Sequence, residues 1–274
     1  MVMLPRRGRR PDPWAGAHVI ITGGSKGIGA AVAETAHAAG SRVSLIARDP
    51  KALQEKAAHL GGAAWAAADV GDEHEVTAAI AALESRQGPC DILVCVAGVS
   101  LPGRFLEVPT EEFEQQMRVN YLGSVYAVRA VLPGMVARRR GHVILTSSTA
   151  GLIGVVGLSG YAATKFALVG LASSLRYEVE PAGVKVSVLF PPDTDTPGFE
   201  AENLRKPVEC AAVSGTIKVM PATEVARALI DGVRKGRSQI TADSMTAALT
   251  VAGSTLEPAV RASMTRTIRR AMDR

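Results

Sequence analysis

Short runs of apolar and β-branched residues recur along this chain from His18 onward, with longer Ala-rich stretches between them. The runs span 18–22, 42–47, 63–68, 91–96, 141–146 and 185–190, and a weaker one spans 238–241. Apolar residues recur with the helical period over 27–39, 50–60, 72–86, 110–138, 159–180 and 221–234. Strands that alternate with helices are typical of repeated βαβ units, because parallel strands need a crossover between them. The pattern predicts one α/β domain with a doubly wound parallel sheet of six to seven strands.

The composition agrees with a globular protein and excludes several other classes. Of the 274 residues, 47% are hydrophobic and 21% are charged, so the chain can bury a core and is not a disordered polymer. No run of about 18 apolar residues exists that could span a bilayer. The three cysteines, Cys90, Cys95 and Cys210, are odd in number and lack a paired spacing. We therefore expect neither disulfides nor a metal site, and a cytoplasmic location.

Much of the net charge of +5 comes from the two ends of the chain. Four arginines lie within residues 1–10 without the apolar segment of a signal peptide, so we expect residues 1–16 to form a basic, disordered arm. Residues 17–254 are expected to form the cofactor-binding domain. In the tail, arginines lie mostly off one row of apolar residues that recur at every fourth position. The apolar residues of that row are Leu256, Val260, Met264, Ile268 and Met272. This spacing predicts a cationic amphipathic helix over 255–274, packed either on protein or on an anionic membrane.

A glycine-rich loop follows the first expected strand and leads into the first expected helix. It contains TGGSKGIG at residues 22–29, whose glycines allow a tight turn and a close approach of the backbone to a pyrophosphate. Backbone N–H groups and the helix dipole then attract the anion. A simple tight turn is the alternative, but the strand before and the helix after favour a dinucleotide site. We expect contacts from Thr22, Gly23, Ser25, Lys26, Gly27, Ile28 and Gly29.

The end of the second strand indicates which dinucleotide binds. An acidic residue there would hydrogen-bond a ribose 2′-hydroxyl, whereas a cation would accommodate a 2′-phosphate. The chain has Ala47, Arg48 and Asp49 at this point. The guanidinium fork of Arg48 suits a phosphate and Lys26 adds a second cation, so we expect NADPH/NADP. The alternative is a solvated Arg48 beside an Asp49 that caps the next helix.

A serine, a tyrosine and a lysine follow the fifth expected strand. Ser148 precedes Tyr161 by thirteen residues, and Tyr161 and Lys165 lie four residues apart on one helix face. Asn120 lies in the preceding long helix. Hydride reduction of a ketone leaves an alkoxide that needs a proton, which a tyrosine can supply. A lysine about 5 Å away favours the phenolate by on the order of 3 kcal/mol, so we expect Lys165 to lower the pKa of Tyr161. Alternatively, Ser148 and Asn120 are only helix or turn caps.

Together, the glycine loop and these four residues resemble the TGxxxGxG loop and the catalytic tetrad of short-chain dehydrogenase/reductases, which have the Rossmann fold. The resemblance implies that Lys165 also binds the nicotinamide ribose, that Ser148 holds the substrate carbonyl, and that Asn120 seats a water that relays protons. It further implies cofactor contacts from Asp69, Val70, Ala97, Gly98, Pro191, Thr194 and Thr196. Two departures are CVAG at 95–98 in place of NNAG, and Pro191–Pro192 in place of PG.

Three further segments, NYLGSVY at 120–126, PPDTDTPGF at 191–199 and KP at 206–207, resemble one branch of that family, the 3-ketosphinganine (3-ketodihydrosphingosine) reductases. This resemblance implies NADPH-dependent reduction of a long-chain 3-keto-2-amino lipid, with a mobile lid over 193–220. Within the lid, an alkyl chain has the candidates Phe199, Leu204, Val208 and Val213, and an ammonium has Asp193, Asp195, Glu200 and Glu202. Solvated or helix-capping acids are the alternative.

Two other functions stay open at this point. One is a general short-chain carbonyl reductase or alcohol dehydrogenase that acts on another lipidic β-keto substrate, and the other is an NADP-sensing protein without catalysis. Nucleic-acid binding is not expected, because aromatic residues do not accompany the basic ones. The family resemblance implies a homodimer or homotetramer packed through the helices around Asn120 and Lys165. A lipidic substrate favours peripheral contact of the 255–274 helix with an anionic membrane.

Overall fold

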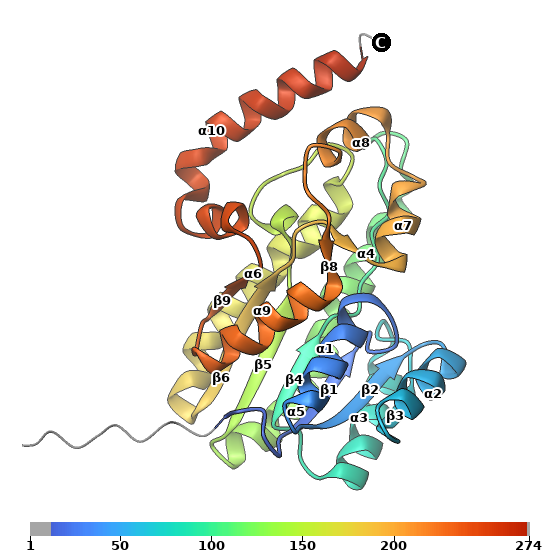
Figure 1. Ribbon diagram of the computed structural model, residues 1–274, viewed down its shortest axis with the longest axis vertical. Helices are drawn as coiled ribbons and strands as arrows, with labels where there is room; N and C mark the ends of the chain where they lie inside the picture. The colour runs from blue at the N-terminus through green and yellow to red at the C-terminus, as the bar shows by residue number, and fades with distance from the viewer. Residues whose placement is uncertain (1–11, 273–274) are drawn as a thin grey trace, which may run out of the picture.

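A computed structural model describes residues 12–272 and contains a seven-stranded sheet in the order β3-β2-β1-β4-β5-β6-β9 (Figure 1). All neighbouring strands of this sheet are parallel. The strands are β1 (His18–Thr22), β2 (Arg42–Ala47), β3 (Ala64–Ala67), β4 (Ile92–Cys95), β5 (Gly141–Thr146), β6 (Val184–Phe190) and β9 (Gln239–Thr241). The expected doubly wound α/β fold is therefore confirmed.

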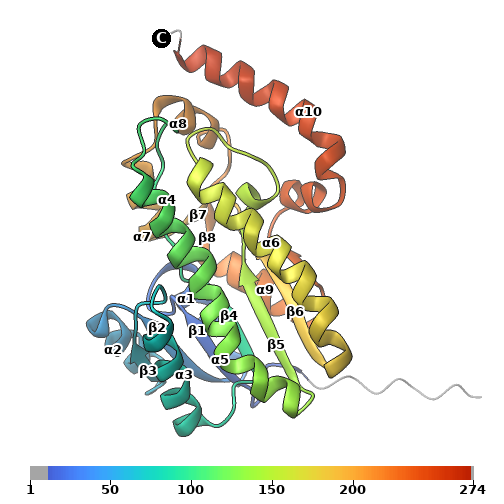
Figure 2. The ribbon, with the colours of Figure 1, turned by 180° about the vertical axis from the view of Figure 1, so that it is seen from behind.

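Helices cover both faces of the sheet, which Figures 1 and 2 show from opposite sides. One face carries α1 (Gly27–Ala38), α2 (Pro50–His59) and α9 (Ala222–Arg234). The other face carries α3 (Glu73–Gln87), α5 (Gly123–Ala137) and α6 (Ser159–Val179). Because the strands are buried on both faces, they appear in the sequence as nearly continuous apolar runs.

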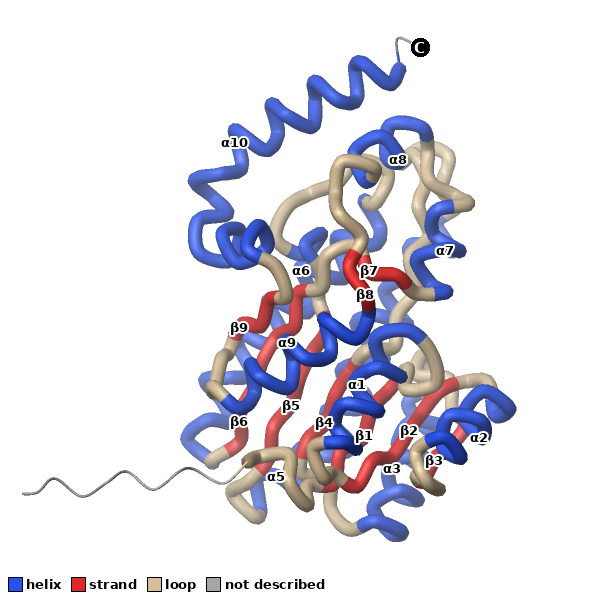
Figure 3. Tube along the Cα trace, in the orientation of Figure 1, coloured by secondary structure: helices blue, strands red, loops and turns tan. Residues whose placement is uncertain are grey.

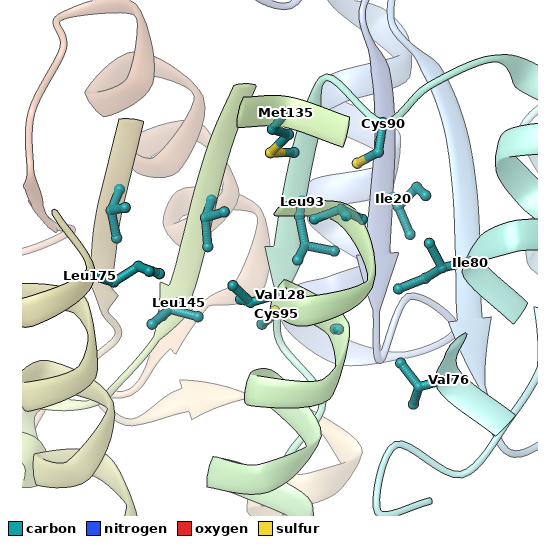
Figure 4. Packing of buried hydrophobic residues seen from close by; sticks show 14 of the residues in the cluster. Ile20, Val76, Ile80, Cys90, Leu93, Cys95, Val128, Met135, Leu145 and Leu175 are labelled. Atoms are coloured by element: carbon teal, nitrogen blue, oxygen red, sulfur yellow. The ribbon is translucent and has the colours of Figure 1, made fainter. Parts of the chain in front are cut away.

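The core beneath α3, α5 and α6 joins the central strands to one stripe of each helix. Leu93 of β4 and Leu145 of β5 belong to one cluster with Ile80 of α3, Val128 of α5 and Leu175 of α6 (Figure 4). This packing holds α5, which follows the turn with Asn120, and α6, which contains Lys165, at fixed positions over the sheet.

The strand order reverses at β1, which pairs with β2 on one side and with β4 on the other. Thr22 at the end of β1 lies opposite Ile46 and Cys95 in register. Ligands of doubly wound sheets bind outside the carboxyl ends of the strands at such a reversal. Figure 3 shows the loops that follow these strands at the end of the sheet nearest α7 (Pro197–Asn203) and α8 (Val208–Ser214).

The expected disordered arm over 1–16 is wrong for residues 12–16. Trp14 is fully buried, and its indole N–H donates to the carbonyl of Ile230 (3.2 Å). Asp12 Oδ2 accepts from Arg234 Nη2 (2.8 Å). A buried indole with a hydrogen-bond partner anchors this segment on α9. Residues 1–11, with the four arginines, and residues 273–274 lie outside the described part of the chain.

Two other segments differ from the expected elements. The helix expected over 110–138 is divided into α4 (Thr110–Gln116), a π-helical turn η1 (Met117–Leu122) and α5. The 193–220 segment contains β7 (Thr194–Asp195), α7, α8 and β8 (Met220–Pro221). β7 and β8 form a separate parallel pair, which closes the segment into a loop over the end of the main sheet.

The C-terminal helix α10 (Ser244–Met272) begins well before residue 255. Its backbone is non-helical at Ala252, where the direction changes, and Figures 1 and 2 show the longer arm beyond this kink at the edge of the molecule. α10 packs against α8, so this helix contacts the 193–220 segment.

Candidate active site

The loop between β1 and α1 has the backbone shape that a pyrophosphate needs. Gly23 has a φ of +71°, a conformation that favours glycine, and its N–H donates to Ile46 O (2.8 Å). A Cβ on Gly29 would clash with the carbonyl of Gly23, so the start of α1 approaches the loop only because no side chain intervenes. Ser25 and Ile28 are partly buried within the same loop.

The amino end of α1 lacks the side-chain cap that the next two helices have. Asp49 caps α2 and Asp72 caps α3, each by accepting from two backbone N–H groups. At α1, the N-cap residue Lys26 makes no side-chain capping bond, and the first turn has no acidic residue. Within the described residues, the first N–H groups of α1 therefore stay available for an anion, and the loop fits a dinucleotide pyrophosphate.

The two expected cations lie close to this loop in different surroundings. Arg48, directly after β2, is exposed, and no carboxylate of residues 12–272 forms an ion pair with it. Lys26 Nζ lies 3.4 Å from Asp49 Oδ2 at the surface. The pKa of Asp49 is lowered, first by the N–H of Ala52 in the α2 cap and also by Lys26. Asp49 thus caps a helix, as the alternative interpretation holds, while Arg48 is accessible to a phosphate.

Loops after β4 and β6 meet the glycine loop. The N–H of Ala97 donates to Thr22 Oγ1 (3.4 Å), so the loop with CVAG in place of NNAG still reaches the end of β1. A Cβ on Gly27 would lie 3.0 Å from Thr196 Cγ2. Thr196 also caps α7 by accepting from the N–H of Phe199 (3.1 Å). The structure thus brings Thr22, Gly27, Ala97 and Thr196 together.

The remaining expected cofactor residues have partners of their own. Asp69 Oδ1 accepts from the N–H of Gly71 (2.9 Å), and Val70 is buried. The carbonyl of Pro191 accepts from the N–H of Thr149 (3.2 Å), and Thr194 is buried with its hydroxyl on Pro192 O (2.7 Å). Pro191 therefore connects the end of β6 to the turn that follows Ser148.

Ser148 lies where β5 turns into the short 3-10 helix η2 (Thr149–Gly151). Its Oγ accepts from the N–H of Ala150 (3.2 Å), so Ser148 does cap this turn. Lys165 is buried one turn after Tyr161 on α6, and its Nζ donates to Thr146 O (3.0 Å) and lies 5.2 Å from the centre of the Tyr161 ring. Ser148 and Tyr161 are partly exposed, whereas Lys165 is buried.

Contrary to the expectation from its spacing with Lys165, the pKa of Tyr161 is not lowered overall. The pKa of Tyr161 is raised, first because burial disfavours the phenolate and then because Glu202 and Asp193 add negative charge; a hydrogen bond with Ser148 acts in the opposite direction. Burial also lowers the pKa of Lys165 to about 8. At neutral pH the phenol is therefore protonated, which is the form that can donate a proton to an alkoxide.

Asn120 lies in the π-helical turn η1, a local geometry that is frequent at functional sites. It is fully buried; its Nδ2 donates to Val99 O (2.9 Å) and Thr164 Oγ1 (3.0 Å), and its Oδ1 accepts from Val99 N (2.8 Å). A Cβ on Gly98 would lie 3.2 Å from Asn120 Oδ1 and 3.6 Å from Lys165 Nζ. Asn120 thus fixes the loop after β4 beside Lys165 by hydrogen bonds to the backbone of Val99. One lone pair of Asn120 Oδ1 is left to accept a further hydrogen bond.

A cleft of about 490 Å³ opens between the loop at 102–109 and the connection of α7 to α8. Two ion pairs lie beside it: Arg104 of the loop pairs with Glu209 of α8 (2.7 Å), and Arg205 of the connection pairs with Glu112 of α4 (2.7 Å). Four exposed apolar side chains belong to these stretches of the chain, and of them only Val208, the first residue of α8, lines the cleft: Phe105, Leu106, Leu204 and Val208. We call these four residues the apolar rim.

The candidate substrate contacts of the 193–220 segment divide into exposed and occupied groups. Leu204 and Val208 belong to the apolar rim, Val213 is buried, and the ring of Phe199 lies below Lys206 Nζ (4.3 Å). Asp195 and Glu200 are exposed. Glu202 Oε1 pairs with Lys206 (2.9 Å), and Asp193 Oδ2 accepts from Ser214 Oγ (2.5 Å).

Sequence reasoning missed some residues that support the site. Thr246 of α10 is fully buried, and its hydroxyl shares a hydrogen bond with that of Thr149 (3.1 Å), next to Ser148. No motif marked Thr246. Lys206 belongs to a segment typical of the family, but the signal for its ion pair with Glu202 is the four-residue spacing between them.

The family of short chain dehydrogenases matches this chain over residues 17–207. A 3-dehydrosphinganine reductase of Danio rerio is 40% identical over 236 residues, which cover 83% of this chain and 71% of that protein. A 3-ketodihydrosphingosine reductase of Dictyostelium discoideum is 36% identical over 265 residues, which cover 89% of this chain and 79% of that protein. These relatives confirm the resemblance that the motifs indicate.

Solved structures agree with the fold. A short-chain dehydrogenase from Streptomyces avermitilis is 27% identical, with a TM-score of 0.78 over 92% of this chain and 96% of that one. A short chain dehydrogenase/reductase from Burkholderia phymatum, solved in complex with NAD, is 25% identical, with a TM-score of 0.77 over 87% of this chain and 92% of that one. Among the described residues, no helix is both long and apolar enough to cross a bilayer, and no cluster of His, Cys, Asp and Glu could hold a metal ion.

Proposed function

Because this chain belongs to the short-chain dehydrogenase family of oxidoreductases, we propose that it reduces the ketone of a long-chain 3-keto-2-amino lipid, 3-ketosphinganine to sphinganine, with NADPH. The observation that carries this proposal is the grouping of Ser148, Tyr161 and Lys165 beyond the carboxyl end of β5, at the same edge of the sheet as the uncapped start of α1. The apolar rim suits an alkyl chain, because contact with the chain would remove these exposed apolar side chains from water.

Each catalytic side chain has a distinct task in this reaction. A bound reduced nicotinamide supplies the hydride, and the first turn of α1, Arg48 and Lys165 would hold the cofactor. Ser148 Oγ donates to the ketone oxygen and fixes its position. Tyr161 Oη gives its proton to that oxygen as the alkoxide forms, and the buried Lys165 ammonium stabilises the phenolate that remains. Asn120 positions the loop after β4 against Lys165.

A direct assay tests the proposed substrate. Purified protein with NADPH is expected to reduce 3-ketosphinganine faster than a panel of other β-keto lipids of equal chain length. Preference for another lipid ketone would assign the chain to the more general carbonyl reductase. Binding of NADPH without turnover on any ketone would support a cofactor-sensing protein.

NADPH is expected to bind at least about 10-fold more tightly than NADH, because a charge-assisted pair between Arg48 and a 2′-phosphate contributes about 1.5–3 kcal/mol. Arg48→Ala should remove most of this preference, as measured by titration with both cofactors. Lys51→Ala is the matched control, because Lys51 is an exposed cation of α2 that does not follow the strand end directly. Equal affinities in the wild type would contradict the assignment.

The longer arm of α10 is expected to bind anionic vesicles reversibly and in a salt-sensitive way. Arg266, Arg269 and Arg270 are exposed there, and each basic residue near an anionic surface contributes about 1 kcal/mol. Replacing all three with Glu should lower the vesicle partition coefficient by at least about 10-fold in co-sedimentation at low salt. Unchanged partition, or no binding by the wild type, would leave α10 as a helix that packs on the protein alone, against α8 and β9.

The homodimer or homotetramer implied by the family stays a prediction. Exposed Phe166 and Tyr177 on α6 and Val136 on α5 support it, since a partner subunit could cover them.

A further inference from the structure

Side chains of the 193–220 segment form one hydrogen-bonded polar cluster. Lys206 Nζ donates to Glu202 Oε1 (2.9 Å) and to Ser214 Oγ (2.9 Å), and Ser214 Oγ donates to Asp193 Oδ2 (2.5 Å). The Lys206 side chain is only 3% exposed, and its ammonium lies 4.3 Å from the centre of the Phe199 ring. Burying an ammonium requires such partners, so these contacts define a specific arrangement rather than a solvated surface.

The charges of this cluster do not balance. Two carboxylates face one ammonium, so the cluster has one more acidic than basic side chain. Lys206 contacts Glu202 directly, whereas Asp193 reaches the ammonium only through the hydroxyl of Ser214. Asp193 Oδ1 has no hydrogen-bond partner within residues 12–272, and Asp193 is partly exposed. The excess negative charge is therefore on Asp193, with one oxygen open to a ligand.

The cluster contacts the stretch between Ser148 and Tyr161, which joins β5 to α6. The carbonyl of Pro191, two residues before Asp193, accepts from the N–H of Thr149 (3.2 Å). A Cβ on Gly157, four residues before Tyr161, would lie 3.4 Å from Pro207 Cδ, next to Lys206. The carboxylates of Asp193 and Glu202 both raise the pKa of Tyr161, as negative charges near its hydroxyl would.

We propose that Asp193 Oδ1 binds the ammonium of the substrate, an inference that rests on the function proposed above. In a 3-keto-2-amino lipid, the nitrogen is attached to the carbon next to the ketone. When Ser148 and Tyr161 hold the ketone oxygen, the ammonium lies a few bonds from Tyr161. Asp193, whose negative charge acts on Tyr161, then supplies an acceptor and the balancing charge. Glu202 is already paired with Lys206. Asp195 and Glu200 are exposed, where water weakens an ion pair.

The test compares 3-ketosphinganine with an analogue that has hydrogen in place of the amino group. The wild type should show a kcat/KM for the amine at least about 10-fold higher than for the analogue. Asp193→Asn should lower kcat/KM for the amine by at least about 10-fold, mainly through KM, and leave the analogue within about 3-fold of the wild type. Asp193→Glu should recover part of the preference, because it keeps a carboxylate. Glu200→Gln makes the same chemical change at an exposed position and should preserve the wild-type ratio.

Several outcomes separate this inference from the function it rests on. A wild type that reduces both ketones equally well would overturn the inference and leave the lipid ketone reductase standing. Reduction of neither ketone would overturn the proposed function itself. The assignment of the ammonium site to Asp193 would be contradicted if Asp193→Asn kept the wild-type ratio of kcat/KM between amine and analogue. It would also be contradicted if Glu200→Gln lost that ratio. If Asp193→Asn does not fold in a thermal unfolding measurement, Asp193→Ser provides a second neutral variant for the same comparison.

Discussion

Tyr161→Phe is expected to lower kcat for ketone reduction by about 10²–10⁴-fold, the range that a positioned general acid contributes. The variant keeps the aromatic ring beside Lys165 and loses only the proton donor, so the affinity for NADPH should change little. Steady-state oxidation of NADPH gives kcat, and a fluorescence titration gives the cofactor affinity. Because burial and the nearby carboxylates raise the pKa of Tyr161, its protonation should not limit the wild-type rate near neutral pH.

Tyr177→Phe provides the matched control for this variant. Tyr177 lies on the same helix and is 81% exposed, so its hydroxyl can be removed without touching the site. It should retain wild-type turnover. A Tyr161→Phe variant that kept more than a few per cent of wild-type kcat would assign the proton donor to another group.

Lys165→Met is expected to reduce kcat/KM by more than about 100-fold and yet to stabilise the folded protein. Burial lowers the pKa of Lys165 from 10.5 to about 8, so keeping the ammonium charged inside the protein costs about 3 kcal/mol at pH 7. The variant loses the charge-assisted hydrogen bond to Thr146 O, which contributes about 1.5–3 kcal/mol. The net gain in the free energy of unfolding is therefore about 0–1.5 kcal/mol.

The pH dependence of this gain identifies its cause. Below pH 8, Lys165 is protonated in both the folded and the unfolded wild type, so the full desolvation cost is present. Between pH 8 and 10.5, the unfolded state binds more protons, and the wild type gains stability as the pH rises. The advantage of the Met variant should shrink over that interval in urea denaturation. Lys235→Met, at an exposed position, should show no such trend, and a destabilised Lys165→Met at pH 7 would contradict the argument.

Strands and helices around the cofactor edge were predictable because their causes are local. Residues of β1, β2 and β5 coincide with the apolar runs, since a strand buried on both faces needs a continuous run. The glycine loop could likewise be located, because its spacing and its place between a strand and a helix describe the turn. The motifs also placed Ser148, Tyr161 and Lys165 in one site, since a turn and one helix face bring them together.

Other features depend on contacts between distant segments and were not predictable. Trp14 lies in a basic N-terminal stretch without a pattern, and its burial requires the carbonyl of Ile230 on α9. The π-helical turn at Asn120 precedes Gly123, where a Cβ would lie 2.9 Å from Val70 O, so the close packing there is a tertiary constraint. β7 and β8 have two residues each and pair only because the 193–220 segment closes on itself.

By itself, the sequence determined the main strands and helices of the sheet domain, the family and the residues proposed for the reduction, because periodicity and short motifs act over a few residues. Only the tertiary structure decided the charge around Tyr161. Its four-residue spacing from Lys165 predicted a lowered pKa, but Glu202 and Asp193 arrive from another segment and burial removes water, so the pKa is raised. Coulombic and desolvation effects depend on distance in space, and no local pattern reveals which distant carboxylates come close.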